Sequence, residues 1–500
     1  NLGVIGEVNE EDKIVVWTTM GRDQAQIIRN LITNGYNSQG GGRSAVLELV
    51  AGGSLIPSIL AGVGPDISMG HGSGDVINWA IRSAVVGIDK MEGYEEVTSW
   101  FSPAAMVPLT LRELFWEKDV SQNELNEAYV MTDADIAAYW AYDANRGMGD
   151  NLTFGQFAYK IALSKGYHSV RYLDNKGTAD TSDDENLYYR ETVYGLPETQ
   201  SFSMLFYRAD IFMDLGIQAP TTWEELLSIV PKLQANHMEV AFPTSLGGLN
   251  LFLYQMGGEL YADDGREIAI DSDLGLSAFE YLCQFFDQHR FPVSYDFANR
   301  FRSGEIPIGI MDYTSYTHLS VYATEIKGLW QFVPLPAYVV ADEETGEELW
   351  RNNNAVSGVS SIIMVRNENR PASKDAAAWD FMKWYVSAET QTTYANELTA
   401  LLGSVSKHNT ANVQALESLP WTTTEKNNLL EQFANLSAVP EYPGSYIISR
   451  YVDFAFKAVY NDHADAADSL QEYIIEINKE LSRKREEFGM AYTSISFSQK

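Results

Sequence analysis

The feature that most constrains the fold is an alternation of strand-like and helix-like segments near the N-terminus. Residues 14–17 are a short apolar run, which is typical of a buried parallel strand. A helix is expected from about Asp23, with Gly35 as its C-terminal stop. A second strand, a short helix and a third strand follow, over 45–50, 54–62 and 67–69. This β-α-β-α-β order predicts an open parallel sheet with helices on both faces.

Sheets of this kind bind ligands in the crevice beyond the carboxyl ends of their strands. In this chain two such ends fall at 18–21, after the first strand, and at 70–73, after the third. Both segments carry side chains that can donate or accept hydrogen bonds. We therefore expect them to contribute to a ligand site.

From about 110 to 192 the sequence becomes helical in pattern, aromatic and acidic, and it closes with an acidic loop at 174–185. We interpret this segment as an insertion. The α/β character then returns with a strand over 203–207 and a helix that begins at a capping box of Thr222 and Glu225. Four more strands and a C-terminal amphipathic helix are expected over 240–242, 306–311, 330–333, 361–365 and 470–483. The pattern predicts two α/β lobes with a cleft between them.

Composition narrows the classes of partner. The 35 Lys+Arg residues against 68 Asp+Glu residues give a formal net charge of −33, which excludes a phosphate-backbone binder and a polybasic membrane binder. With 45% hydrophobic residues the chain is too apolar to be disordered. Its 28 Tyr and 11 Trp suit cores and also the flat faces of sugars.

Several kinds of chemistry lack support. The single cysteine, Cys283, lies in an apolar run and is expected to be a buried, inert thiol. The seven His show no metal-type spacing, and neither a P-loop nor a G-x-S-x-G element is present. No signal peptide and no apolar run of about 18 residues is visible. The chain begins with Asn1 rather than Met, which is compatible with a removed targeting segment.

An ordered set of motifs resembles the extracellular solute-binding proteins of bacterial ABC importers, and within them the sugar-binding group that includes maltose-binding protein. The most specific part is the run from Tyr194-Gly195-Leu196-Pro197 to Pro220-Thr221-Thr222-Trp223. The other parts are the opening strand, a Gly-Pro-Asp element before the third strand and three later stretches, at 13–17, 47–67, 302–311, 379–381 and 385–386. The match covers roughly 13–110 and 193–490 and leaves the insertion outside.

The resemblance implies an α/β, two-lobed periplasmic-binding-protein type II fold with hinged lobes and an extra helical insertion. Lobe one is expected to hold 13–197 plus 336–402, with the insertion at about 110–192, and lobe two 198–335 plus 403–490. Closure of the lobes buries the ligand. The expected function is to bind an extracellular carbohydrate, an oligosaccharide, and deliver it to ABC permease subunits. The resemblance also implies a monomer that contacts the membrane only through a lipid anchor, at the cell surface or in the periplasm.

A neutral oligosaccharide offers hydroxyls and apolar ring faces, so its site needs forked polar groups and flat rings. Strand ends, the first crossover and the aromatics that follow later strands supply residues of these types. The predicted ligand-binding residues are Thr19, Met20, His71, Ser73, Glu198, Gln200, Ser245, Tyr313, Tyr316, Tyr446 and Arg450. Helix capping, hinge hydrogen bonds and core packing are the alternative roles for them.

The oxygen-rich side chains of the acidic loop suggest a calcium site, with Asp174, Asp180, Asp183 and Glu185 as ligands. Lys176 stands where the EF-hand pattern needs an oxygen ligand, so a solvated acidic loop is the preferred interpretation. No other metal or cofactor is expected.

Two other functions remain open on the sequence. One is a glycoside hydrolase, for which Glu198 is a candidate carboxylate without an evident partner. The other is a binding protein for a peptide or a polyamine, because the charge of −33 suits a cationic ligand. A non-catalytic sugar-binding protein is the preferred hypothesis.

Overall fold

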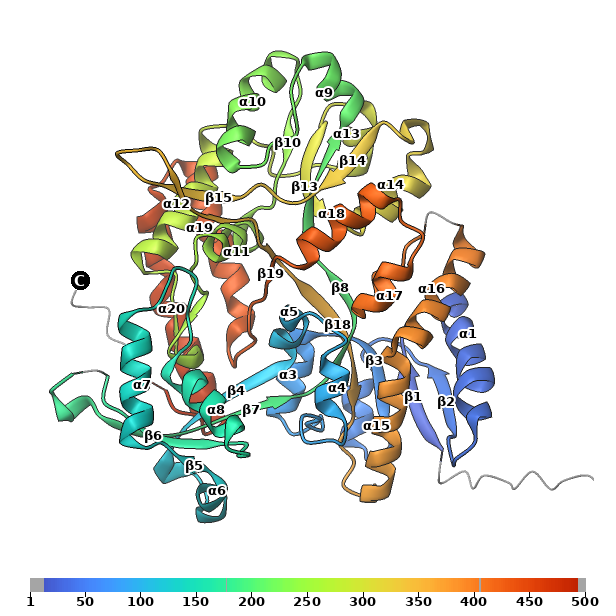
Figure 1. Cartoon of the computed structure of the whole chain (residues 1–500), viewed down its shortest axis with the longest axis vertical. Coiled ribbons are helices and arrows are strands. Elements are labelled where there is room, and N and C mark those ends of the chain that lie inside the picture. Colours follow the sequence, from blue (N-terminus) through green and yellow to red (C-terminus); the bar gives the residue numbers. More distant parts are fainter. Residues whose placement is uncertain (1–12, 177, 404–405, 493–500) are drawn as a thin grey trace, which may run out of the picture.

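A computed structural model describes residues 13–176, 178–403 and 406–492. It has two α/β lobes, each built on its own central sheet, as the sequence predicts. In Figure 1 lobe one lies at the lower right, lobe two above it, and the insertion, in teal, at the lower left. Within the described ranges, no helix combines the length and the apolar composition that a membrane span requires.

The sheet of lobe one contains the predicted N-terminal strands. Its order is β2 (Ala45–Leu49), β1 (Ile14–Thr18), β3 (Ile67–Gly72), β18 (Gly358–Met364) and β8 (Leu196–Ser201). The first three strands are parallel, and β18 is antiparallel to both of its neighbours. In β1 every second residue is buried, which is the strand periodicity.

Helices cover both faces of this sheet, as predicted. One face packs against α1 (Arg22–Leu31), α15 (Ala372–Val386) and α16 (Ala388–Leu402). Two short helices join the same core, α4 (Tyr94–Thr98) and α5 (Pro103–Met106). The other face packs against α2 (Leu55–Leu60) and α3 (Ser73–Ile81). The carboxyl end of β3 leads directly into α3 and therefore fixes where this helix begins.

Lobe two has a four-stranded mixed sheet in the order β10 (Val240–Ala241), β13 (Ile308–Asp312), β9 (Ser203–Arg208) and β14 (Trp330–Val333). Its core contains the fully buried Trp223, whose indole N–H donates to Oε1 of Gln255 at 2.6 Å. The helices of the lobe are α9 (Ala209–Leu215), α10 (Trp223–Ala235), α11 (Ser245–Gln255), α12 (Asp273–Asp287), α13 (Phe297–Ser303), α14 (Ser315–Tyr322), α17 (Val413–Ser418), α18 (Thr423–Phe433), α19 (Ile448–Asp462) and α20 (Ala466–Glu487).

The segment 110–192, for which we keep the name insertion, has the predicted helices and also a sheet that the sequence analysis did not predict. The strands are β4 (Thr110–Trp116), β7 (Glu185–Val193), β6 (Val170–Asp174) and β5 (Tyr129–Val130), in this order. The helices are α6 (Gln122–Glu127), α7 (Asp133–Ala144) and α8 (Phe154–Ser164). Tyr139, Phe154 and Tyr172 belong to a separate core, so many of the aromatics in this segment stabilise the insertion itself.

In the ranges that the structure describes, the chain passes between the two lobes at three places. Strand β8 continues through Phe202 into β9, and β17 (Ala355–Val356) continues through Ser357 into β18. The third passage lies beside β8, where Thr410 forms a bridge with Thr199. Strands β8 and β18 are visible in Figure 1 as the connection that runs from lobe one toward lobe two. Side-by-side crossings of this kind are the usual position of a hinge.

The second passage lies after residue 352 rather than near 335. The hairpin of β15 (Tyr338–Ala341) and β16 (Glu348–Asn352) precedes it and is bracketed by contacts with lobe two. Gln255 of α11 donates to the carbonyl oxygens of Pro336 and Asn354, at 3.1 and 3.2 Å. Leu335 belongs to the core of lobe two. The assignment of the other lobe boundaries stays a prediction.

Two local predictions differ in detail. The helix does not end at Gly35, because α1 continues as a π-helical turn, Ile32–Tyr36. The hydroxyl of Tyr36 donates to Asp380 at 3.0 Å, which ties this turn to α15. At α10 the hydroxyl of Thr222 accepts from the N–H of Glu225 as predicted, but the Glu225 carboxylate accepts from Thr221 instead.

Candidate functional site

A cavity of about 600 Å³ lies between α3 of lobe one and helices α11, α19 and α20 of lobe two. It adjoins the carboxyl end of β3, where a sheet of this type is expected to bind a ligand. We call it the interlobe cavity. Its polar and aromatic lining includes Asp75, Asn78, Arg82, Asn250, Tyr261, Glu441, Tyr442, Tyr446, Lys484 and Phe488.

Helix α3 supplies the lobe-one wall of this cavity. Asp75, Asn78 and Arg82 are spaced by three and four residues, so they share one face of the helix. The Arg82 guanidinium donates to the backbone carbonyl of Asn78 at 2.9 Å and lies 5.4 Å from the ring centroid of Phe488. The wall therefore presents a carboxylate, an amide and a held cation.

Glu441 connects the two walls. Its Oε1 accepts from the hydroxyl of Ser73, at the start of α3, at 3.2 Å. Its Oε2 accepts from the hydroxyl of Ser445, in lobe two, at 3.3 Å. Burial raises the pKa of Glu441, while the hydrogen bonds with Ser73 and Ser445 oppose this shift. The carboxylate is thus held at the meeting point of the lobes with acceptor capacity left for a ligand.

Aromatic rings cover the lobe-two wall. Tyr261, in the short strand β11 (Tyr261–Ala262), packs edge-on against Tyr442 with ring centroids 4.8 Å apart. Tyr446 is 61% exposed, and its hydroxyl donates to Glu480 of α20. An exposed ring held by its hydroxyl is ready to cover an apolar ligand face.

Asn250, on α11, adds an amide to the same wall. Its Oδ1 is buried and has no hydrogen-bond partner among the described residues. A buried acceptor without a partner costs free energy until a donor is supplied. The amide therefore carries unused hydrogen-bonding capacity at the edge of the cavity.

Four predicted residues lie at or beside this cavity. Tyr446 lines it, and Ser73 contacts its wall through Glu441. Ser245 and Arg450 directly neighbour lining residues in sequence. The hydroxyl of Ser245 donates to Asp453 at 2.7 Å, so its donor is already used. Whether any of the four binds ligand stays a prediction.

The other predicted lobe-one residues lie at strand ends outside the lining of this cavity. Thr19 is exposed, and the N–H of Met20 donates to the hydroxyl of Thr18 at 3.3 Å. The Nε2 of His71 lies 2.5 Å from the hydroxyl oxygen of Ser68. The imidazole ring packs edge-on against Trp79. Burial lowers the pKa of His71 to about 4, so the imidazole is neutral near pH 7.

Glu198 and Gln200 belong to the hinge strand β8 and are both buried. The Glu198 Oε2 accepts from the N–H of Gly70 at 2.8 Å. The Gln200 amide donates to the hydroxyls of Ser102 and Ser357, at 3.0 and 3.2 Å. These hydrogen bonds join β8 to neighbouring segments. Both side chains are therefore hydrogen-bonded within the hinge region. Burial raises the pKa of Glu198 to about 8.

Replacing Glu198 by glutamine is expected to change how stability depends on pH. The folded protein keeps a proton on Glu198 that the unfolded chain releases above its ordinary pKa of 4.5. The free energy of unfolding of the wild type should therefore fall, as pH rises from about 4.5 to 8, by on the order of 5 kcal/mol relative to Glu198→Gln. Urea unfolding at several pH values measures this difference. The exposed-site control Glu347→Gln should follow the wild type, and parallel curves for Glu198→Gln would contradict the assignment.

The predicted rings after β13 lie inside lobe two. Tyr313 is 2% exposed and packs against Phe202 at 4.8 Å between ring centroids. Tyr316 contacts Trp330 and Trp421 and lines a separate cavity of about 410 Å³. The structure therefore places neither ring in the lining of the interlobe cavity.

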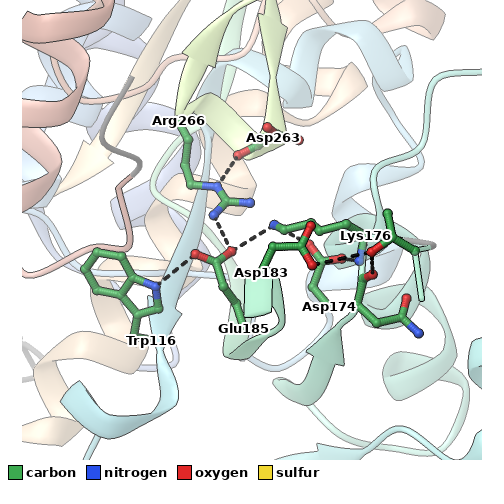
Figure 2. A network of polar contacts seen from close by, with 9 residues as sticks. Trp116, Asp174, Lys176, Asp183, Glu185, Asp263 and Arg266 are labelled. Atoms are coloured by element: carbon green, nitrogen blue, oxygen red, sulfur yellow. Dashed lines mark hydrogen bonds and ion pairs between the residues drawn. The ribbon is translucent and has the colours of Figure 1, made fainter. Parts of the chain in front are cut away.

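The acidic loop is held by cations of the protein itself. Figure 2 shows the Glu185 carboxylate between Lys176 and Arg266. The Lys176 Nζ and the Arg266 Nη1 lie 2.8 and 2.7 Å from the Glu185 Oε2. Burial raises the pKa of Glu185, but the hydrogen bonds from Lys176 and Arg266 outweigh it and lower the pKa to about 2. Asp174 also pairs with Lys176, whereas Asp180 accepts from the backbone of Ser182. In the described part of the chain no group of three or more His, Cys, Asp or Glu is arranged to hold a metal ion.

Most of the cavity lining was missed by the sequence analysis. Only Asp75 and Asn78 could have been predicted as lining residues from the sequence. They follow the third strand by a few residues and lie on one face of the helix after it. Tyr261 and Glu441 come from segments without regular periodicity, and only the fold brings them together.

Comparison with known families and structures adds independent information. The profile of a family described as bacterial extracellular solute-binding protein matches residues 121–420, a range that includes residues 121–192, which the sequence analysis had left outside the family pattern. No curated protein matches the chain in sequence.

Solved structures share the fold at low sequence identity. The sugar-binding protein MalE from Xanthomonas citri has a TM-score of 0.62 at 15% identity, over 95% of this chain and 99% of that one. A cyclo/maltodextrin-binding protein in complex with maltotetraose has a TM-score of 0.61 at 15% identity, over 94% and 97%. An ABC transporter solute-binding protein from Thermotoga lettingae, bound with α-D-tagatose, has 0.57 at 16%, over 94% and 99%.

Proposed function

Because the chain belongs to the bacterial extracellular solute-binding proteins, we propose that it binds a neutral oligosaccharide in the interlobe cavity and delivers it to the permease of an ABC importer. The observation that carries the proposal is the lining of that cavity. Carboxylates and amides are combined there with tyrosine rings. Forked polar groups suit paired sugar hydroxyls, and flat rings suit the apolar faces of the sugar.

The charges around the cavity favour a neutral ligand over a polyamine. Asp75 and Glu441 are opposed by Arg82 and Lys484 in the same lining. A polyamine site needs an excess of carboxylates to neutralise several ammonium groups. The volume of about 600 Å³ lies within the range of 300–1,000 Å³ that is usual for small-molecule sites.

The proposal includes a binding cycle without catalysis. The lobes rotate about the three adjacent crossings and close on the ligand. Glu441 accepts hydrogen bonds from both walls, which supports a role in holding the closed form. The protein acts as a monomer, and the closed form docks on the permease.

A thermal-shift screen of the full chain tests the proposal. The panel contains malto-, cello-, xylo- and manno-oligosaccharides, mixed peptides and spermidine. A ligand at 100 times its Kd adds about 2.7 kcal/mol to the free energy of unfolding, which raises Tm measurably. We expect at least one oligosaccharide series to raise Tm, and calorimetry to give one site per chain.

Reducing-sugar release, measured on the same mixtures, separates binding from hydrolysis. Turnover of any oligosaccharide would replace the proposal with a glycoside hydrolase. If only spermidine or peptides raise Tm, the protein is a binding protein for that class of ligand and not for oligosaccharides.

A further inference from the structure

A second cavity, of about 450 Å³, lies between the insertion and residues 253–272 of lobe two. We call it the insertion cavity. We propose that it binds the distal units of the same carbohydrate chain whose other end occupies the interlobe cavity. The inference rests on the proposed function, and it assigns to the insertion the selection of long oligosaccharides over short ones.

The two cavities share lining residues with a third. A middle cavity of about 340 Å³ lies between them, and Tyr261 lines all three. Tyr442 borders the interlobe and middle cavities. Asn151 and Glu259 border the middle and insertion cavities. The shared lining makes the three cavities neighbours around Tyr261, and the proposal places a linear ligand along this row.

The insertion cavity has the same chemical character as the interlobe cavity. Trp140 lines it, only partly buried, with its ring 4.9 Å from that of Tyr139 and 5.9 Å from that of Phe154. Asn151 and Thr153 add an amide and a hydroxyl. Flat rings beside forked polar groups are again the combination that suits sugar units.

The cations that line this cavity are paired within the protein, which disfavours an anionic ligand. Arg266 and Lys176 both bind Glu185, as Figure 2 shows, and Arg146 pairs with Asp143 at 2.5 Å. An anionic ligand would have to compete with these pairs, whereas hydroxyls add hydrogen bonds without breaking them.

Hydrogen bonds between the insertion and lobe two hold the walls of the insertion cavity in place. Asp264 of lobe two accepts from the hydroxyl of Thr153 at 2.6 Å and from the amide of Gln156 at 3.1 Å. The Asn151 amide donates to the carbonyl of Gly257 at 2.9 Å.

The test is calorimetry on the full chain with malto-, cello-, xylo- and manno-oligosaccharides of two to eight units. For the series that binds, affinity should keep rising after the interlobe cavity is filled. Trp140→Ala should weaken the longest members about tenfold and leave the shortest unchanged. Ala262→Phe, which fills the insertion cavity without removing a core ring, should have the same effect. Tyr167→Ala, at an exposed ring of the insertion outside the cavity, is the matched control.

Fluorescence gives a second readout. The emission of wild type minus that of Trp140→Phe isolates Trp140, and it should change with long members only.

Two outcomes separate this inference from the proposed function. If short and long members bind equally, and neither Trp140→Ala nor Ala262→Phe changes the affinity of long ones, the inference is overturned and the proposed function stands. If no member of any series binds, both are overturned.

Discussion

Glu441→Ala is expected to weaken oligosaccharide binding by 10- to 100-fold without unfolding the protein. The side chain lines the interlobe cavity and accepts hydrogen bonds from Ser73 in lobe one and Ser445 in lobe two. Its removal takes away ligand acceptors and the direct contact between the walls. Hydrogen bonds to charged groups are worth about 1.5–3 kcal/mol, which corresponds to this range in Kd. Calorimetry with the oligosaccharide found by thermal shift measures the loss.

Two variants control this experiment. Glu441→Gln keeps the shape and one acceptor, so it should lose less affinity than the alanine variant. Glu343→Ala, at an exposed position in the β15–β16 hairpin, should bind like the wild type. An unchanged Kd for Glu441→Ala would exclude the interlobe cavity as the binding site, and the ligand would then have to bind elsewhere.

Asp264→Ala is expected to lower the free energy of unfolding by about 3 kcal/mol. The carboxylate is 5% exposed, and it holds the insertion to lobe two through Thr153 and Gln156. Truncation to alanine leaves the Thr153 hydroxyl and the Gln156 amide without their common acceptor. The residue also has a φ of 55°, which alanine tolerates less well than aspartate. Urea unfolding followed by circular dichroism measures the change.

Asp264→Asn separates the two causes, since asparagine tolerates this backbone conformation and keeps an acceptor. It should lose clearly less stability than the alanine variant. Asp214→Ala, at an exposed position, is the control for loss of an acidic side chain. A loss below about 0.5 kcal/mol for Asp264→Ala, within the usual range for a surface change, would show that the insertion is held by other contacts.

The central sheets were predictable because their strands carry plain signals. The run 14–17 is apolar and short, and the strand found there alternates buried and half-buried residues. The sheet of the insertion was not predictable in the same way. In β4 the buried residues Leu111 and Leu114 are three positions apart, which is the spacing of a helix face. Pairing with β7 along its whole length overrides that local signal.

The position of the candidate site was predictable, but much of its lining was not. The carboxyl end of β3 leads into the α3 wall, as the rule for open sheets requires. Tyr313 follows a strand end in the same way, yet the crossing residue Phe202 packs against its ring. Tyr261 and Glu441 enter the cavity from segments far apart in sequence. Such contacts depend on tertiary packing, which a local pattern does not encode.

The insertion has a mechanical consequence. Its first and last strands, β4 and β7, connect it to lobe one, where the N–H of Tyr194 donates to the carbonyl of Leu109 at 3.0 Å. Its far side bonds lobe two, where the N–H of Ala491 donates to the carbonyl of Leu114 at 2.8 Å. The lobes are therefore clasped at a second point besides their crossings. Wide opening must bend this clasp or release it, so we expect a small opening angle and a ligand entrance on the side away from the insertion.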